Sequence, residues 1–163
     1  MSKRTADERR VEASVEIAAA PEAVWALVTD IGRMPEFSPE LKAARWISAV
    51  AEAKVGARFT GSNRHGAARW STACEVIDAQ PGRRFAYRVT YLGLPISEWS
   101  YELEPTAAGT RLTEATVDRR SRLVKYTTGP ATGVLNRAEH NLAGIRATLA
   151  AVKAVAEREA VSA

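Results

Sequence analysis

The chemistry that this sequence can support centres on a carboxylate in a strand-like segment. In "TRLTEATV" the residues alternate so that Leu112, Glu114 and Thr116 share one face of a strand. If Leu112 points toward the interior, Glu114 does too. A buried carboxylate without partners is costly, so an inward Glu114 needs a hydrogen-bond partner or a raised pKa. Such a group can anchor a ligand hydroxyl or amine, or act as a general acid or base.

The register of a hairpin decides which way Glu114 points. The preceding segment, "SEWSYEL", alternates Trp99, Tyr101 and Leu103 with polar residues. If Leu103 lies opposite Leu112, the carboxylate faces inward, opposite Tyr101. A slip of one residue would turn it to solvent. The alternatives to a ligand role are therefore a solvated strand residue and a structural hydrogen-bond acceptor.

Other polar residues give weaker signals. Asn63 is a second candidate for ligand binding, because an amide donates and accepts without the cost of burying a charge; otherwise it is a turn residue beside "RHG". We expect His65 and His140 to lie far apart at the surface. Cys74 should pack rather than react, since no histidine pattern accompanies it. No metal-ligand spacing appears, and we expect neither a metal nor a cofactor.

Length, charge and cysteine content narrow the class of protein. The chain has 163 residues, so we expect one domain over residues 1–163, with residues 1–9 as a flexible extension. The formal net charge is +4 without a dense basic stripe, so we expect no nucleic-acid partner. The single cysteine favours a reducing compartment. No apolar run matches a signal peptide or a membrane span, and we expect a cytoplasmic protein without stable membrane insertion.

The elements that must position these side chains follow a simple order. A half-buried strand over residues 11–18 precedes a helix over residues 19–30, which a proline opens. A short helical turn follows in "RMPEFSPE". Strand-like runs between turn signals then predict six strands, near residues 42–47, 57–63, 69–77, 84–91, 97–103 and 110–117.

The last third of the chain predicts a long helix. From Val134 the apolar residues step by three or four, which places Leu142, Ile145 and Leu149 on one face and leaves Arg137 exposed. The sheet is the only partner large enough for that face, so the predicted domain is α+β. Residues 119–133 should form a loop-like connector between the last strand and this helix.

Alternation along the central strands gives the sheet one face rich in aromatic residues. Their other residues are largely polar, as a solvated outer surface requires. The inward face is assigned to Phe59, Gly61, Asn63, Trp70, Thr72, Cys74, Val76, Phe85, Tyr87, Val89, Tyr91, Trp99, Tyr101 and Leu103. These side chains can fill a core or line a pocket, and the sequence pattern is the same in both cases.

This order of elements resembles the START/SRPBCC superfamily, in particular its bacterial polyketide cyclase/dehydrase and lipid-transport-like members. The resemblance is carried by "VEASVEIAAAPEAVWALVTDIGRMPEFSPEL", "GARFTGSNRHGAARWSTACEVIDAQPGRRFAYRV", "WSYELEPTAAGTRLTEAT" and "NLAGIRATLAAVKAVAE", which cover nearly the whole chain. It implies a helix-grip fold, in which a curved seven-stranded antiparallel sheet wraps a long C-terminal helix and leaves a cavity. It also favours the register that turns Leu112 and Glu114 inward.

The implied cavity makes inward residues of the sheet and the closing helix candidates for ligand contact. The connector over residues 119–133 is either part of the mouth, where its arginines would attract an acidic group, or a solvated link. Pro35, Phe37 and Pro39 are candidates for the rim. The candidate ligand-binding residues are Phe59, Asn63, Trp70, Thr72, Phe85, Tyr87, Trp99, Tyr101, Leu112, Glu114, Leu142 and Ile145.

Two classes of function fit these expectations. The leading interpretation is the binding or transport of a small hydrophobic molecule, such as a lipid or polyketide, in the internal cavity. The alternative is a cofactor-independent enzyme of the polyketide cyclase, aromatase or dehydratase type, in which Glu114, Tyr101 and Asn63 would polarise or deprotonate the substrate. A regulatory role with a protein partner is neither supported nor excluded.

Overall fold

A computed structural model describes residues 9–47, 49 and 51–163. The flexible extension predicted for residues 1–9 therefore lies almost wholly outside the described residues. The elements follow the predicted order, with one additional helix near the C-terminus. They are β1 (Arg10–Ile17), α2 (Pro21–Thr29), α3 (Met34–Phe37), β2 (Leu41–Trp46), β3 (Arg58–His65), β4 (Ala68–Gln80), β5 (Arg84–Tyr91), β6 (Leu94–Thr106), β7 (Gly109–Asp118), α4 (Arg122–Thr132) and α5 (Arg137–Ser162).

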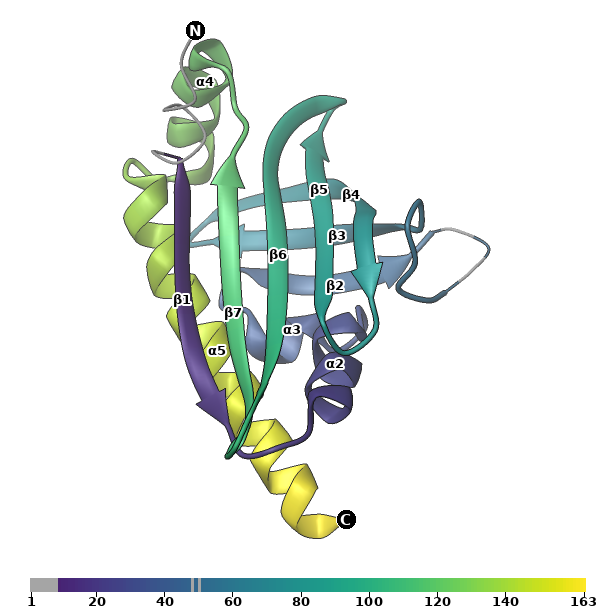
Figure 1. Cartoon of the computed structure of the whole chain (residues 1–163). Coiled ribbons are helices and arrows are strands. Elements are labelled where there is room, and N and C mark those ends of the chain that lie inside the picture. The colour runs from purple at the N-terminus through teal and green to yellow at the C-terminus, as the bar shows by residue number, and fades with distance from the viewer. Residues whose placement is uncertain (1–8, 48, 50) are drawn as a thin grey trace, which may run out of the picture.

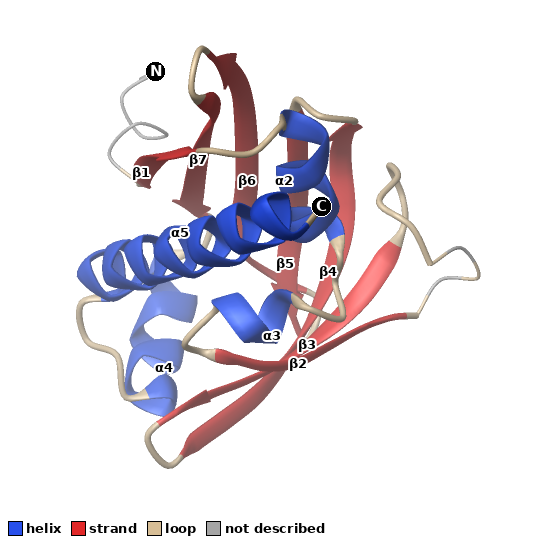
Figure 2. Ribbon diagram, turned by 90° about the horizontal axis from the view of Figure 1, so that it is seen from below, coloured by secondary structure: helices blue, strands red, loops and turns tan. Residues whose placement is uncertain are grey.

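The strands form one antiparallel sheet of seven strands in the order β1-β7-β6-β5-β4-β3-β2. β1 and β2 lie at opposite edges of this sheet, and the segment with α2 and α3 connects them. Register shifts in the β2–β3, β4–β5 and β5–β6 pairings accompany a strong bend, so that β2, β3 and β4 cross behind the others (Figure 1). The long helix α5 lies along the concave side together with α2 and α3 (Figure 2). This architecture is the α+β helix-grip fold that the sequence predicts.

The long helix begins at Arg137, three residues later than the apolar pattern predicts. Asn136 caps it, because its side-chain oxygen accepts a hydrogen bond of 3.3 Å from the backbone N–H of Glu139. Ile145 and Leu149 are buried against the sheet as predicted, and Val152 and Ala156 continue the buried face. Leu142 is only half-buried, and Arg137 is less exposed than predicted.

The connector over residues 119–133 is not a loop but contains helix α4. The side-chain oxygen of Ser121 accepts from the backbone N–H of Val124 at 3.3 Å, which caps the helix, and Gly133 ends it with a φ of 70°. Helix α4 contains Pro130, although proline usually disrupts the interior of a helix. Gly129, Pro130 and the threonines of this segment have low helix propensity, so the sequence predicts a loop here.

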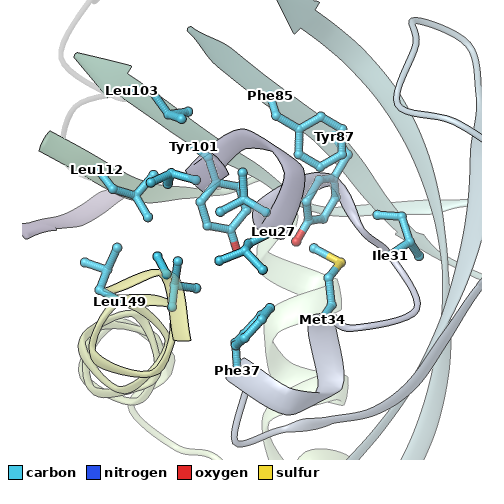
Figure 3. Packing of buried hydrophobic residues seen from close by; sticks show 14 of the residues in the cluster. Leu27, Ile31, Met34, Phe37, Phe85, Tyr87, Tyr101, Leu103, Leu112 and Leu149 are labelled. Atoms are coloured by element: carbon cyan, nitrogen blue, oxygen red, sulfur yellow. The ribbon is translucent and has the colours of Figure 1, made fainter. Parts of the chain in front are cut away.

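The hydrophobic core lies where the helices cover the sheet directly. Figure 3 shows Leu27 of α2 and Leu149 of α5 facing inward side chains of the strands. Phe85 is fully buried and meets the Trp25 ring edge-on, with 6.1 Å between ring centroids. Leu112 and Ile145 are also fully buried. The core thus occupies only part of the concave face and leaves the rest for a cavity.

Candidate ligand-binding cavity

A cavity of about 440 Å³ lies between the concave face of the sheet, α3, α4 and α5. Its wall on the sheet side is largely aromatic and apolar, and α5 supplies the opposite wall through residues such as Thr148 and Val152. Phe37 and Pro39 border it, in keeping with their predicted place at the rim. The candidate residues that line it are Phe59, Asn63, Trp70, Thr72, Tyr87, Trp99, Tyr101 and Glu114.

Four other candidates do not line the cavity: Phe85, Leu112 and Ile145 lie in the core, and Leu142 is half-buried outside it. Alternation assigned Phe85 to the concave face and the family resemblance favoured the same face for Leu112, and both assignments are correct. However, α2 covers Phe85, and α5 packs against β1 and β7 around Leu112 and Ile145. Strand alternation identifies a face, whereas the docking position of each helix decides which part of that face remains open.

The register of β6 and β7 turns Glu114 inward. Leu103 pairs with Leu112 and Tyr101 pairs with Glu114, which confirms the predicted register. The Tyr101 hydroxyl donates a hydrogen bond of 2.9 Å to Glu114 Oε1, whereas Oε2 is buried without a partner in the described part of the chain. Burial raises the pKa of Glu114 to about 8, and the Tyr101 hydrogen bond offsets only part of that rise. The carboxyl group is therefore mostly protonated at neutral pH.

Two further groups reach the same region of the cavity. Burial raises the pKa of Tyr87 well above its usual value, with smaller contributions from Cys74 and Glu114. The Tyr87 and Tyr101 rings project from the sheet with both hydroxyls directed toward Met34 and Phe37 (Figure 3). Burial also raises the pKa of Cys74 to about 12, so its thiol stays protonated and is a poor nucleophile. We refer to Glu114, Tyr101 and Tyr87 as the inner polar group.

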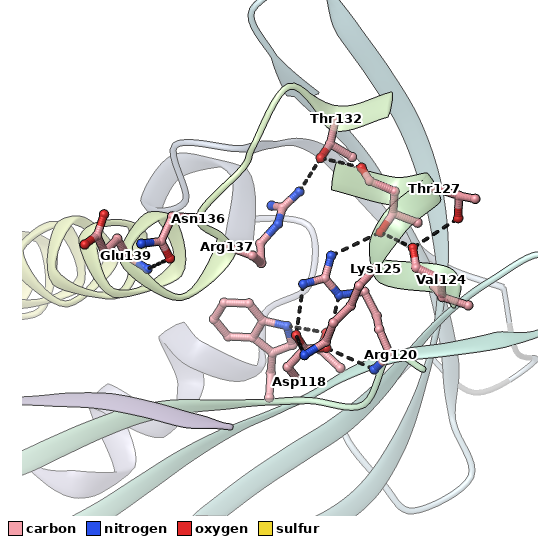
Figure 4. A network of polar contacts seen from close by, with 12 residues as sticks. Asp118, Arg120, Val124, Lys125, Thr127, Thr132, Asn136, Arg137 and Glu139 are labelled. Carbon is pink, nitrogen blue, oxygen red and sulfur yellow. Dashed lines mark hydrogen bonds and ion pairs between the residues drawn. The ribbon is translucent and has the colours of Figure 1, made fainter. Parts of the chain in front are cut away.

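Charged side chains gather where the cavity meets solvent. Arg120, 8% exposed, donates to both carboxylate oxygens of Asp118, at 3.1 and 2.9 Å, and to the Thr128 hydroxyl of α4 at 3.1 Å (Figure 4). Burial alone would raise the pKa of Asp118, but the hydrogen bonds and charges of Arg120 and Lys125 lower it below its usual value. This network fastens α4 to the end of β7.

A second charged cluster joins the start of α5 to the β2 edge of the sheet. Arg137 donates to Glu40 at 3.0 Å and to the Thr132 hydroxyl at 2.7 Å (Figure 4 shows the latter bond), and its guanidinium lies 5.9 Å from the centroid of the Trp70 ring. His140 Nε2 lies 3.7 Å from Glu40 Oε2. We refer to Glu40, Asp118, Arg120 and Arg137 as the mouth.

The prediction that the two histidines lie far apart was wrong. The rings of His65 and His140 contact each other edge to face, with 4.9 Å between centroids, and His65 Nδ1 lies 3.2 Å from the Thr132 carbonyl oxygen. Burial lowers the pKa of His140, and the charge of Arg137 and of His65 lowers it further, against the opposing effect of Glu40. The residues are remote in sequence, and only the docking of α5 against the β3–β4 hairpin brings them together.

The sequence did not single out the residues of the mouth. Arg120 belongs to the basic stretch "RRSRLVK", which suggested attraction of an acidic group, but nothing in that stretch marks one arginine as buried. Arg137 was assigned to the exposed side of its helix. The signal that could have found it is the asparagine cap at Asn136, which places Arg137 in the first turn, beside the end of α4.

In the described ranges, His, Cys, Asp and Glu side chains form no group of three suited to hold a metal ion. Within the same residues no helix is both long and apolar enough to cross a membrane.

The curved sheet, the long closing helix and the cavity between them define a helix-grip protein of the SRPBCC type. The sequence profile described as "Polyketide cyclase / dehydrase and lipid transport" matches residues 8–157. The chain therefore belongs to this family. Comparison with curated proteins gave no match.

Solved structures agree with this assignment. The Polyketide_cyc-like protein Cgl2372 from Corynebacterium glutamicum is 35% identical, with 92% of each chain covered and a TM-score of 0.64. Protein NE0264 from Nitrosomonas europaea is 15% identical, with 94% of this chain and 97% of that chain covered and a TM-score of 0.70. The di-domain ARO/CYC StfQ from the steffimycin biosynthetic pathway is 18% identical, with a TM-score of 0.73. This alignment covers 94% of the present chain and 54% of StfQ, and both distant similarities concern the fold.

Proposed function

We propose that the protein binds a small, largely apolar molecule inside the cavity. The observation that carries this proposal is the cavity itself, because its volume of about 440 Å³ falls within the usual range of sites for small ligands. Apolar and aromatic side chains form most of the wall, and a few polar groups converge on it. Membership of a family that includes lipid-transport proteins supports the same reading.

Glu114 is the polar anchor in this proposal. An unsatisfied buried oxygen costs about 1 to 3 kcal/mol, and a ligand group that bonds Oε2 would recover part of that cost. The apolar remainder of the ligand would contact rings such as Phe59, Tyr87 and Trp99, which line the wall. Binding would thus combine burial of apolar surface with one specific hydrogen bond.

A steric block of the cavity tests this function. Thr148 is buried on α5 and lines the cavity, whereas its neighbour Ala147 is exposed and does not. The Thr148→Phe variant should bind the fluorescent fatty acid cis-parinaric acid at least about tenfold more weakly than wild type, while Ala147→Phe binds it normally. Thermal unfolding would verify that both variants are folded. Equal binding by all three proteins would reject the cavity as the binding site.

Catalysis of the polyketide cyclase, aromatase or dehydratase type is the second candidate. It is favoured by Glu114, because a carboxyl group with a pKa of about 8 can both give and take a proton near neutral pH. Tyr101 and Asn63 would polarise the substrate, and the fold similarity to the ARO/CYC StfQ is compatible with such a role. With a short poly-β-ketone thioester as substrate, wild type should exceed the uncatalysed rate of cyclisation. Glu114→Gln should lose that excess yet retain binding.

A further inference from the structure

Four ionised side chains that line the cavity lie at the mouth. Glu40, Asp118, Arg120 and Arg137 are paired with one another there, through Arg120–Asp118 and Arg137–Glu40. In the part of the chain that the structure describes, Glu114 forms no ion pair, and its one hydrogen bond comes from Tyr101. The inner polar group therefore offers no counterion to a charged group of a ligand.

This arrangement fixes the hydrogen-bonding character of the inner polar group. Because Tyr101 donates to Oε1, that oxygen is already an acceptor. A neutral carboxyl group carries its proton on the other oxygen, Oε2, which finds no acceptor among the described residues. The Tyr87 hydroxyl lies on the same side of the sheet as the Tyr101 hydroxyl and adds a second donor (Figure 3). The inner polar group thus presents hydrogen-bond donors to the cavity, and a ligand that carries an acceptor would satisfy them.

The free energy of placing a ligand group beside Glu114 depends on the charge of that group. A carboxylate or phosphate would be an anion buried without a cation, which is strongly unfavourable. An amine would have to ionise Glu114 and bury an ion pair, whose desolvation offsets much of the attraction. The oxygen of a ketone, ester or amide accepts hydrogen bonds without any change of charge. The uncharged acceptor is therefore the group that fits.

The strand spacing sets the length of the ligand. Glu114 and Asp118 are four residues apart on β7, which ends beside α4 (Figure 1). At about 3.3 Å per residue, the inner polar group and the mouth are roughly 13 Å apart. Arg69 also lines the cavity and forms no ion pair with another described residue, so it can meet an anionic group at the mouth.

We propose that the ligand is an elongated molecule whose inner end carries an uncharged oxygen acceptor, bonded by the carboxyl group of Glu114, and whose ionised group, where it has one, stays at the mouth. This rests on the proposed binding function and names the ligand class. Fatty-acid-like or polyketide-like chains with a carbonyl group remote from a carboxylate belong to this class.

Matched probes of one chain length test the inference by calorimetry near pH 6.5. They are dodecanoic acid, the same acid with a ketone next to its methyl end, the corresponding ω-amino acid, and the methyl ketone that lacks the carboxylate. The keto acid should bind at least about tenfold more tightly than dodecanoic acid, and the amino acid should bind more weakly than both. Arg69→Gln should weaken binding of the keto acid but leave binding of the methyl ketone unchanged.

Two variants of Glu114 separate a neutral donor from a charged anchor. Glu114→Gln should keep the preference for the keto acid, because its amide also donates, whereas Glu114→Met should lose it; thermal unfolding verifies that both are folded. Tightest binding of the amino acid, lost in Glu114→Gln, would overturn the inference. Equal binding of dodecanoic and keto acids, blocked by Thr148→Phe, would overturn it while leaving the proposed function intact. Binding of no probe, with cis-parinaric acid unaffected by Thr148→Phe, would reject both.

Discussion

Tyr101 and Glu114 face each other across β6 and β7, and the tyrosine hydroxyl donates a hydrogen bond of 2.9 Å to the carboxyl group. Both side chains are buried, at 5% and 3% exposure. One hydrogen bond does not compensate a carboxylate for the loss of water, so the neutral acid is the favoured form. The proposed function therefore depends on how the fold places this pair, because the carboxyl group of Glu114 keeps its raised pKa only while it is buried.

The first prediction concerns the stability of the fold against pH. Folding raises the pKa of Glu114 from 4.5 to about 8, so the folded state binds the proton more tightly than the unfolded state. The resulting contribution is fully present below pH 4.5 and is lost as the pH rises toward 8, at about 1.4 kcal/mol per pH unit. The ligand-free wild type should therefore become less stable over this window.

Replacement of Glu114 by Gln removes this titration while keeping the shape of the side chain. Urea unfolding of both proteins at a series of pH values between 5 and 8 would measure the effect. The free energy of unfolding of Glu114→Gln should decline less than that of wild type, so the difference between them changes with pH. Parallel profiles would show that Glu114 titrates normally and is not held neutral.

Most of the fold, but only part of the site, could be predicted from the sequence. The register that pairs Tyr101 with Glu114 was expected from the family resemblance, because alternation along β7 alone left a slip of one residue open. The cavity was expected from the family resemblance, since packed and open parts of the concave face share one pattern. Phe85 and Tyr87 alternate identically on β5, yet only Tyr87 lines the cavity.

The mouth was harder to predict for a different reason. Its side chains come from the α3–β2 connection, the end of β7 and the start of α5, and their contacts depend on how α4 docks. The apolar stripe of α5 could be read from Ile145 onward, where the helix covers the sheet. At Arg137 the helix covers the cavity instead, and a half-buried, paired arginine replaces the expected exposed one.

The second prediction tests the packing of α5. Leu149 is 3% exposed, and truncation to Ala should lower the free energy of unfolding by roughly 2 to 5 kcal/mol, because it leaves a void between α5 and the sheet. Arg146→Ala on the exposed side of the same helix is the matched control and should change stability by less than about 0.5 kcal/mol. Chemical unfolding measures both. Similar small effects would mean that the helix presents a different face.

The third prediction concerns two glycines with opposite surroundings. Gly109, in the β6–β7 hairpin, has a φ of 142°, and a Cβ there would lie 2.3 Å from the carbonyl oxygen of Ile17. Gly109→Ala should therefore destabilise the protein by more than about 2 kcal/mol through strain and collision with backbone. Gly144→Ala in α5 meets nothing within 4 Å and should stabilise it by about 0.5 to 1 kcal/mol. Thermal unfolding of the two variants should shift the midpoint in opposite directions.

The last prediction concerns Asp118, which fastens α4 at the mouth. Replacement of Asp118 by Asn removes the charge that partners Arg120, a side chain only 9% exposed, and leaves the guanidinium buried without a counterion. The free energy of unfolding should fall by about 2 kcal/mol at neutral pH. This loss should vanish in strong acid, because folding lowers the pKa of Asp118 below 3.8 and wild type loses the same stabilisation as the pH falls through that lowered value.

Hydrogen exchange would locate the effect of Asp118→Asn. Amides of α4 should exchange faster, because Arg120 also bonds Thr128 and transmits the loss to that helix, while the buried part of α5 around Ile145 should keep its protection. Glu12→Gln is a suitable control, since Glu12 pairs with Arg10 at the surface, where removal of one partner costs little. Unchanged exchange in α4 would show that apolar contacts such as those of the buried Val124, rather than the Asp118–Arg120 pair, hold this helix over the cavity.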